Sequence, residues 1–352
     1  MSAATATHPD GLPTPRRYWS VAAIWLAILM AVLEGAIANV ALPTIGHQLH
    51  AGPAESIWVV NAYQLAVTVS LLPLAALGDI VGYRRVYLAG LALFTLASAG
   101  CAMAHTLHEL TIARVAQGIG GAGIMAINGA LVRFTFPARL LGRGIGLNAM
   151  IVSLSAALGP SVAAAILGVA SWPWLFAVNV PIGVLTILIG WRSLPLTPRA
   201  ERRFDWISGV LNALTFGLLI YGAESTSRNG GGTGVYALAG GLVAGVLLIR
   251  RELTMKAPLV PLDLMRIPVF RLSVLTSILS FAAQMLAFVA LPFFFQGTLH
   301  RSVVETGLLM TPWPLAVAVS APIAGRLADR FHVGLLGQGA WPCSPSAWPC
   351  LP

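Results

Sequence analysis

Two charged residues lie inside long apolar runs of the sequence, where packing alone does not explain them. Residues 21–33 are all apolar, Glu34 follows directly, and the apolar run continues to Ile45. A charged side chain near the bilayer centre costs about 2.5–3.5 kcal/mol on insertion scales. We therefore expect Glu34 to face a polar cavity and take up a proton. The alternative is a carboxylate near the end of the span that snorkels to water.

Arg114 is the second such charge, and it lies in the apolar stretch 109–131. An arginine in a membrane span needs a partner or a water-filled cavity. The functional interpretation has its charge face such a partner or cavity, whereas the structural alternative bonds its guanidinium to backbone carbonyls. Either interpretation requires membrane-spanning helices around both residues.

The composition indicates an all-α integral membrane protein. Of the 352 residues, 57% are hydrophobic and 9% are charged, whereas soluble domains carry about 25% charged residues. There is no phosphate loop and no nucleophile or metal constellation, so the sequence predicts neither ATP-driven transport, nor an enzyme, nor a bound metal or other cofactor. The histidines near residues 47–50 and 105–108 are interpreted as solvated loop residues.

The apolar runs predict ten membrane helices. They cover about residues 19–42, 57–77, 86–105, 109–131, 144–168, 173–193, 206–223, 234–250, 271–295 and 305–326. With the N-terminus in the cytoplasm, 18 of the 21 basic residues fall on the cytoplasmic side and only Arg228 and Arg301 on the other. This bias supports both the span count and the orientation. The same bias explains the net charge of +9 without nucleic acid, because basic residues on the cytoplasmic side face anionic lipid.

Two similar loops follow the second and tenth predicted spans. Residues 74–85 and 325–331 both place Asp after Leu and a small residue, and both continue into basic residues. Internal repeats of this kind are typical of transporters built from two related bundles around a central site.

With these motifs, the sequence resembles the major facilitator superfamily, in its branch of fourteen-span drug:proton antiporters. Residues 33–43 are similar to the branch signature Leu-Asp-x-Thr-x-x-Asn-x-Ala-x-Pro, with Glu34 in place of Asp and Ala36 in place of Thr. The two similar loops resemble the loop motif of the superfamily. Residues 114–122 resemble its proton-transfer motif, and Gly159-Pro160 resembles its antiporter motif. Residues 172–181 resemble the start of span six.

The resemblance implies a domain organisation and roles for individual residues. It implies a cytoplasmic tail (1–17), a six-helix bundle (18–195), a linker with two extra spans (196–265), an incomplete C-terminal bundle of two spans (266–336) and an aberrant Pro/Cys/Trp-rich tail (337–352). Glu34 would be the proton carrier and Arg114 its nearby partner. A nearby cation favours the charged form of a carboxylate and desolvation favours the neutral form, so alternating access could load and release a proton.

Other residues receive gating, packing and binding roles from the same resemblance. The gating loops would be formed by Asp79, Arg84, Arg85, Gly325, Asp329 and Arg330, although the two aspartates could simply cap helices. Gly159 and Pro160 would kink their span. The candidate substrate contacts are Asn39, Asn61, Tyr63, Gln64, Gln117 and Asn148. Sequence alone does not separate those that line a cavity from those that bond across helices.

The end of the sequence departs from the expected fold. Residues 342–352 contain four prolines and two cysteines and cannot form an eleventh span. We therefore expect a frameshifted or prematurely stopped tail, with four of fourteen spans missing.

The leading hypothesis is a proton-coupled antiporter that exports amphipathic drugs or toxic organic compounds across a bacterial cytoplasmic (inner) membrane. Its partners would be protons, small amphipathic molecules and lipid, together with periplasmic or outer-membrane efflux components in a Gram-negative cell. One alternative is a truncated, non-transporting remnant or interaction protein. Another is an exporter of one specific metabolite or siderophore.

Overall fold

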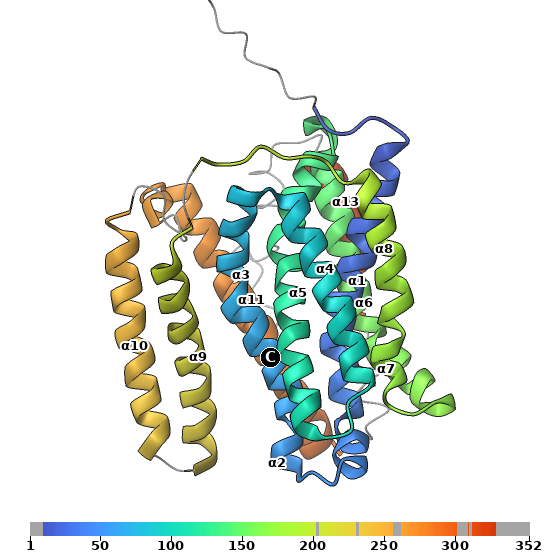
Figure 1. The fold of residues 1–352 in the computed structure, drawn as a ribbon, viewed down its shortest axis with the longest axis vertical. Helices are drawn as coiled ribbons and strands as arrows, with labels where there is room; N and C mark the ends of the chain where they lie inside the picture. The colour runs from blue at the N-terminus through green and yellow to red at the C-terminus, as the bar shows by residue number, and fades with distance from the viewer. Residues whose placement is uncertain are drawn as a thin grey trace, which may run out of the picture.

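The computed structural model describes residues 10–201, 204–229, 232–255, 262–300, 309 and 312–328, and every regular element in that part is helical (Figure 1). The long helices are α1 (Arg16–Gln48), α3 (Trp58–Val81), α4 (Tyr83–Ala102), α5 (Leu107–Thr135), α6 (Leu141–Val169), α8 (Asn179–Ser193), α9 (Trp206–Asn229), α10 (Gly232–Glu252), α11 (Pro268–Phe293) and α13 (Pro312–Ala328). Short elements are α2 (Pro53–Ser56), α7 (Trp174–Ala177), η1 (Ala138–Leu140), η2 (Leu262–Arg266) and η3 (Phe294–Thr298).

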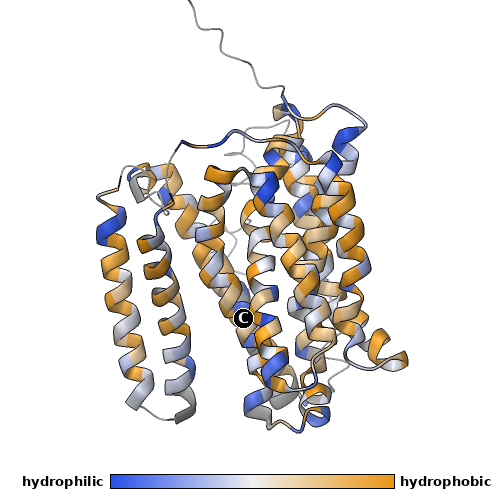
Figure 2. Cartoon of the chain, viewed as in Figure 1, coloured by the Kyte–Doolittle hydropathy of each residue, from blue (hydrophilic) through white to orange (hydrophobic). Residues whose placement is uncertain are grey.

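The all-α membrane class predicted from the composition is confirmed. Within the described residues, eight helices are long and apolar enough to cross a bilayer. The ninth and tenth predicted spans correspond to α11 and α13, whose described apolar stretches at Pro268–Gln284 and Leu315–Ala328 are shorter than those of the other eight, so the count of ten spans stays a prediction. Apolar residues recur along most of the length of the long helices (Figure 2), as expected for helices that cross a bilayer.

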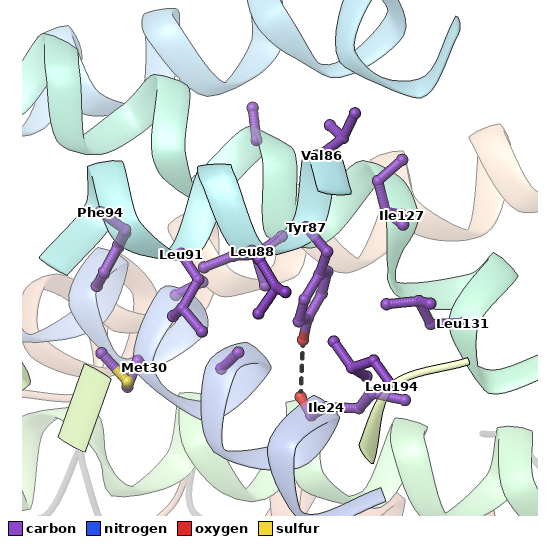
Figure 3. Packing of buried hydrophobic residues seen from close by; sticks show 14 of the residues in the cluster. Ile24, Met30, Val86, Tyr87, Leu88, Leu91, Phe94, Ile127, Leu131 and Leu194 are labelled. Atoms are coloured by element: carbon purple, nitrogen blue, oxygen red, sulfur yellow. Dashed lines mark hydrogen bonds between the residues drawn. The ribbon is translucent and has the colours of Figure 1, made fainter. Parts of the chain in front are cut away.

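Close packing of α5 against α3 and α4 organises the first bundle. Glycines make this approach possible, because a Cβ placed on Gly120 would lie 2.5 Å from the backbone nitrogen of Phe94, and one on Gly118 would lie 2.6 Å from the carbonyl oxygen of Tyr63. Next to this contact, Tyr87 of α4 donates a hydrogen bond of 3.3 Å to the carbonyl oxygen of Ile24 of α1 (Figure 3). Helices α1, α4 and α5 therefore share one apolar core.

Gly82 forms the turn between α3 and α4. Its φ of +105° lies in the region that glycine adopts without strain. The helix α3 continues to Val81, so Asp79 lies in its last turn rather than in a loop. The α6 helix likewise continues from Leu141 to Val169 through Gly159 and Pro160.

Helices α9 and α10 form a hairpin beside the bundle (Figure 1). The hairpin contacts α3, where Asn212 donates a hydrogen bond of 2.8 Å to the carbonyl oxygen of Val69. At the base of the hairpin, Arg251 donates two hydrogen bonds of 3.0 Å to the two carboxylate oxygens of Asp205. This bidentate ion pair ties the start of α9 to the end of α10.

Helix α13 packs along α6 through small residues. A Cβ on Gly146 of α6 would lie 2.5 Å from the carbonyl oxygen of Ala321 and 3.0 Å from the Cα of Gly325. Gly325, predicted to belong to a gating loop, therefore lies at a close helix crossing. Asp329, Arg330 and the tail 337–352 lie outside the described residues.

Candidate functional site

The two charges predicted to lie within membrane spans meet in the buried interior of the bundle. Arg114 Nη1 lies 2.6 Å from Glu34 Oε1, and both side chains are fully buried. Glu34 comes from the middle of α1 and Arg114 from the first half of α5. Because both charges are removed from solvent, their stability depends on mutual pairing and on the polar groups around them.

The second oxygen of Glu34 is held by a third helix. Asn179 Nδ2 donates a hydrogen bond of 2.6 Å to Glu34 Oε2, and Asn179 is itself buried. Asn179 is the first residue of α8, directly after the single turn of α7. Trp172 and Phe176, in edge-to-face contact with ring centroids 6.0 Å apart, anchor this turn in the apolar core. The carboxylate thus receives one charged donor and one neutral donor.

Neutral groups surround the rest of the Arg114 guanidinium. Its Nε donates to the carbonyl oxygen of Val59 at 2.8 Å, and its Nη1 also donates to Gln117 Oε1 at 2.7 Å. The guanidinium carbon lies 4.4 Å from the ring centroid of Tyr63 and 5.6 Å from that of Phe176. Such contacts contribute about 2 kcal/mol each when desolvated. Nη2 has no hydrogen-bond partner among the described atoms.

Gln117 extends the cluster to α4. It lies one turn after Arg114 on α5, and its Nε2 donates a hydrogen bond of 2.9 Å to Ser98 Oγ. Cys101 Sγ approaches Gln117 Oε1 at 3.7 Å, which is the range of a weak sulfur hydrogen bond. Glu34, Arg114, Gln117 and Ser98 therefore form one polar chain across α1, α5 and α4. A change of charge at Glu34 is felt along this whole chain.

The predicted substrate contacts separate into two groups. Tyr63 and Gln117 belong to the buried charge cluster, where Tyr63 also donates its hydroxyl to the carbonyl oxygen of Ala31 at 3.0 Å. The other four are not brought together with it: Asn39 and Gln64 are exposed, and Asn61 and Asn148 are half-buried. Asn39 bonds back to the carbonyl oxygen of Gly35 at 3.0 Å within its own helix.

The predicted gating residues of the first loop contact neighbouring segments. Asp79 Oδ1 accepts a hydrogen bond of 2.6 Å from the Tyr83 hydroxyl, and its carbonyl oxygen accepts one of 2.8 Å from the Ala200 amide. Arg84 donates to the carbonyl oxygen of Trp191 at the end of α8. Arg85 is exposed. These contacts join the α3–α4 turn to the segment that follows α8.

Sequence reasoning missed Asn179, Ser98 and Phe176 as parts of the site. The available signal was weak: Asn179 is an amide within an otherwise apolar stretch, residues 175–185. An amide at the start of a membrane helix has many possible partners, so its proximity to Glu34 is a property of the packed bundle.

Comparison with known proteins yields matches along most of the chain. Residues 24–342 match the sequence model described as Major Facilitator Superfamily. Over 333 residues, the chain is 55% identical to the uncharacterized transporter YebQ of Escherichia coli, covering 93% of this chain and 72% of that protein. It is 32% identical over 309 residues to the riboflavin transporter RibZ of Clostridioides difficile, covering 87% of this chain and 67% of that protein.

Drug exporters and a solved structure are also similar to the chain. The tetracenomycin C resistance and export protein of Streptomyces glaucescens is 31% identical over 354 residues, covering 95% of this chain and 64% of that protein. Among solved structures, the proton:xylose symporter XylE matches with a TM-score of 0.58 at 14% identity, covering 91% of this chain and 70% of that chain. At that identity the likeness concerns the fold alone.

Proposed function

We propose, from the premise that this chain belongs to the Major Facilitator Superfamily of membrane transporters, that it couples the entry of protons to the export of small amphipathic compounds. The observation that carries the proposal is the buried pair of Glu34 and Arg114, 2.6 Å apart and without solvent contact. A buried ionisable pair at membrane depth is a functional-site hypothesis by default.

The surroundings of Arg114 suit a carboxylate that changes its protonation state. When Glu34 takes up a proton, Arg114 loses its negative partner but keeps the Val59 carbonyl, the Gln117 amide and the face of Tyr63. The Arg114 guanidinium can therefore stay charged and buried at its position while Glu34 is protonated. Protonation instead weakens the contact between α1 and α5, and that change is what we propose to be coupled to alternating access.

The choice of amphipathic cargo rests on relatives and on chemistry. One relative is a tetracenomycin C resistance and export protein, and another is the multidrug resistance protein Stp of Mycobacterium tuberculosis. Recognition of such compounds needs an apolar cavity with few fixed polar groups. In this proposal, Asn61, Gln64 and Asn148 contribute polar contacts to the cargo, and Tyr63 and Gln117 act through Arg114.

A single metabolite is the second candidate cargo. It is favoured by the relative described as a riboflavin transporter, which is 32% identical. The two candidates share the same proton-coupling site and differ only in the lining of the cargo cavity.

We propose that the protein lies in a bacterial cytoplasmic membrane with its N-terminus in the cytoplasm. The positive-inside rule supports this orientation, since the basic residues concentrate on the side where α1 begins. Association with periplasmic or outer-membrane efflux components would then extend the export route in a Gram-negative cell.

Efflux from cells tests the proposal. Cells that express the chain are loaded with ethidium or with riboflavin, and efflux is followed with and without a protonophore after membrane insertion has been confirmed. Glu34→Gln removes the titratable group but keeps an acceptor for Arg114. The control is Glu201→Gln, which removes an exposed carboxylate outside the helices.

The expected result is protonophore-sensitive ethidium efflux that Glu34→Gln abolishes and Glu201→Gln leaves unchanged. Efflux of riboflavin but not of ethidium would favour the single-metabolite candidate. Efflux that persists in Glu34→Gln at the original rate would rule out Glu34 as the proton carrier.

A further inference from the structure

A cavity of about 550 Å³ opens between the start of α1 and the end of α8. Its lining combines two arginines with an apolar wall: Pro15, Arg16, Trp19, Leu188, Ile189, Arg192 and Ser193. The volume lies within the range of about 300–1,000 Å³ that is typical of small-molecule sites. This cavity is separate from the polar chain around Glu34, since the two share no residue.

We propose that this cavity binds the headgroup of an anionic phospholipid, with the lipid phosphate at Arg16 and Arg192 and an acyl chain along Leu188. The inference concerns the membrane rather than the cargo, and it holds whatever the protein transports.

The depth of the cavity matches the headgroup layer. Arg16 is the first residue of one candidate span and Arg192 is the second-last residue of another, so both lie where a span leaves the hydrocarbon core. Trp19 and Trp191 are 57% and 66% exposed beside them. Exposed tryptophans at helix ends are typical of the membrane interface.

The positive charge of the cavity is available to a ligand. Arg16 donates from Nε to the carbonyl oxygen of Ser193 and from Nη2 to that of Leu194, both at 3.1 Å. A guanidinium has five N–H donors, so three remain. Arg192 forms no hydrogen bond among the described residues, and neither arginine pairs with a carboxylate there. The planar guanidinium group of an arginine can bind a phosphate group through two parallel N–H···O hydrogen bonds.

The apolar wall distinguishes a lipid from a soluble anion. Leu188 is 63% exposed on the outer face of α8, and its neighbour Leu185 continues this face at 53% exposed. A free phosphate or sugar phosphate would leave this surface uncovered. A phospholipid covers it with an acyl chain while its phosphate reaches the arginines.

Native mass spectrometry of the purified chain tests this inference. The protein is titrated with an equimolar mixture of phosphatidylglycerol and phosphatidylcholine that carry identical acyl chains. A separate arm adds glycerol 3-phosphate, which has the anionic group without the chains. The informative variant is Arg192→Gln, because Arg192 has no hydrogen bond to any described residue that could be lost, whereas Arg16 donates to two carbonyl oxygens at the end of α8. The matched control is Arg139→Gln, an exposed arginine outside the cavity on the same side of the membrane.

We expect the wild-type chain to retain phosphatidylglycerol about fivefold or more over phosphatidylcholine, since one arginine near an anionic headgroup contributes on the order of a fivefold preference. Arg192→Gln should lower this preference by about fivefold, and Arg139→Gln should leave it unchanged. Leu188→Asn should weaken lipid retention without changing any binding of glycerol 3-phosphate.

Equal retention of the two lipids would overturn the inference. The same holds if Arg139→Gln lowers the preference as much as Arg192→Gln, because the selectivity would then reflect general surface charge. Displacement of the lipid by glycerol 3-phosphate at equal concentration would show that the site takes a soluble anion and would likewise overturn it.

Discussion

Asn179 donates a hydrogen bond of 2.6 Å to the carboxylate of Glu34, which lies 145 residues earlier in the sequence. This bond ties the first residue of α8 to the middle of α1. The opposite oxygen of the same carboxylate is occupied by Arg114 of α5. One buried carboxylate therefore joins three helices of the bundle, and any change in its charge or its donors changes how the three are held together.

Removal of the neutral donor should destabilise the bundle. Asn179→Ala leaves Glu34 Oε2 buried without its partner, which costs about 1–3 kcal/mol of unfolding free energy, or more for a charged group. We expect a lower thermal midpoint in detergent, measured by light scattering or intrinsic fluorescence. Asn39→Ala is the matched control, because Asn39 is exposed and, among the described residues, its side chain bonds only within α1. An equal loss in both variants would contradict a specific role for Asn179.

Replacement of the arginine should be more damaging than replacement of the carboxylate. Arg114→Ala leaves Glu34 as an unpaired buried charge, and breaking a buried pair in this way costs about 3–5 kcal/mol. Glu34→Gln keeps a polar acceptor for the guanidinium and should cost less. The double variant Glu34→Gln with Arg114→Ala should then lose less stability than the sum of the two single changes, because residues in direct contact are coupled. Additive losses in a thermal unfolding series would contradict the coupling.

Much of the helical framework could be predicted from the sequence because apolar runs of span length have few other uses. The same reasoning marked Glu34 and Arg114, since isolated charges in such runs demand a partner. The fourteen-span branch, the gating roles and the role of the Gly159-Pro160 pair stay predictions.

The details of the site could not be predicted, because they depend on how the helices pack. Tyr63 was grouped with possible substrate contacts, yet its ring faces the Arg114 guanidinium at 4.4 Å. Asn179 gave no distinct signal, since its partner comes from a helix far away in sequence. One boundary differs from the prediction: α1 continues to Gln48, past the predicted end near residue 42 and through Pro43. Pro43 has no N–H to donate within the helix, yet the helix does not end there, so neither the end of the apolar run nor a single proline fixes the end of this helix.

Glycines on α5 should differ sharply in their tolerance of alanine. In Gly120→Ala the new methyl group would lie 2.5 Å from the backbone nitrogen of Phe94, so α4 and α5 must separate. We expect a loss of about 1–3 kcal/mol, as for other overpacked sites. Gly129→Ala is the control on the same helix, because among the described residues no heavy atom from outside its own stretch of helix backbone lies within 4 Å of its added Cβ. Thermal unfolding of both variants measures the difference in stability. Equal midpoints for Gly120→Ala and Gly129→Ala would contradict the close contact between Gly120 and the backbone of Phe94.

The ion pair at the base of the α9–α10 hairpin should make stability depend on pH in the acid range. Hydrogen bonds from Arg251 hold the pKa of Asp205 at about 2, below its ordinary value of 3.8. Because the folded pKa is the lower one, this contribution is complete above about pH 4 and is lost as the pH falls toward 2. Asp205→Asn should therefore lower the thermal midpoint at pH 5 and remove part of the decline between pH 4 and pH 2. Glu201→Gln, which alters an exposed carboxylate four residues earlier, should keep the wild-type decline. If Asp205→Asn and the wild-type chain lose stability in parallel across that range, the carboxylate does not draw its stabilisation from Arg251.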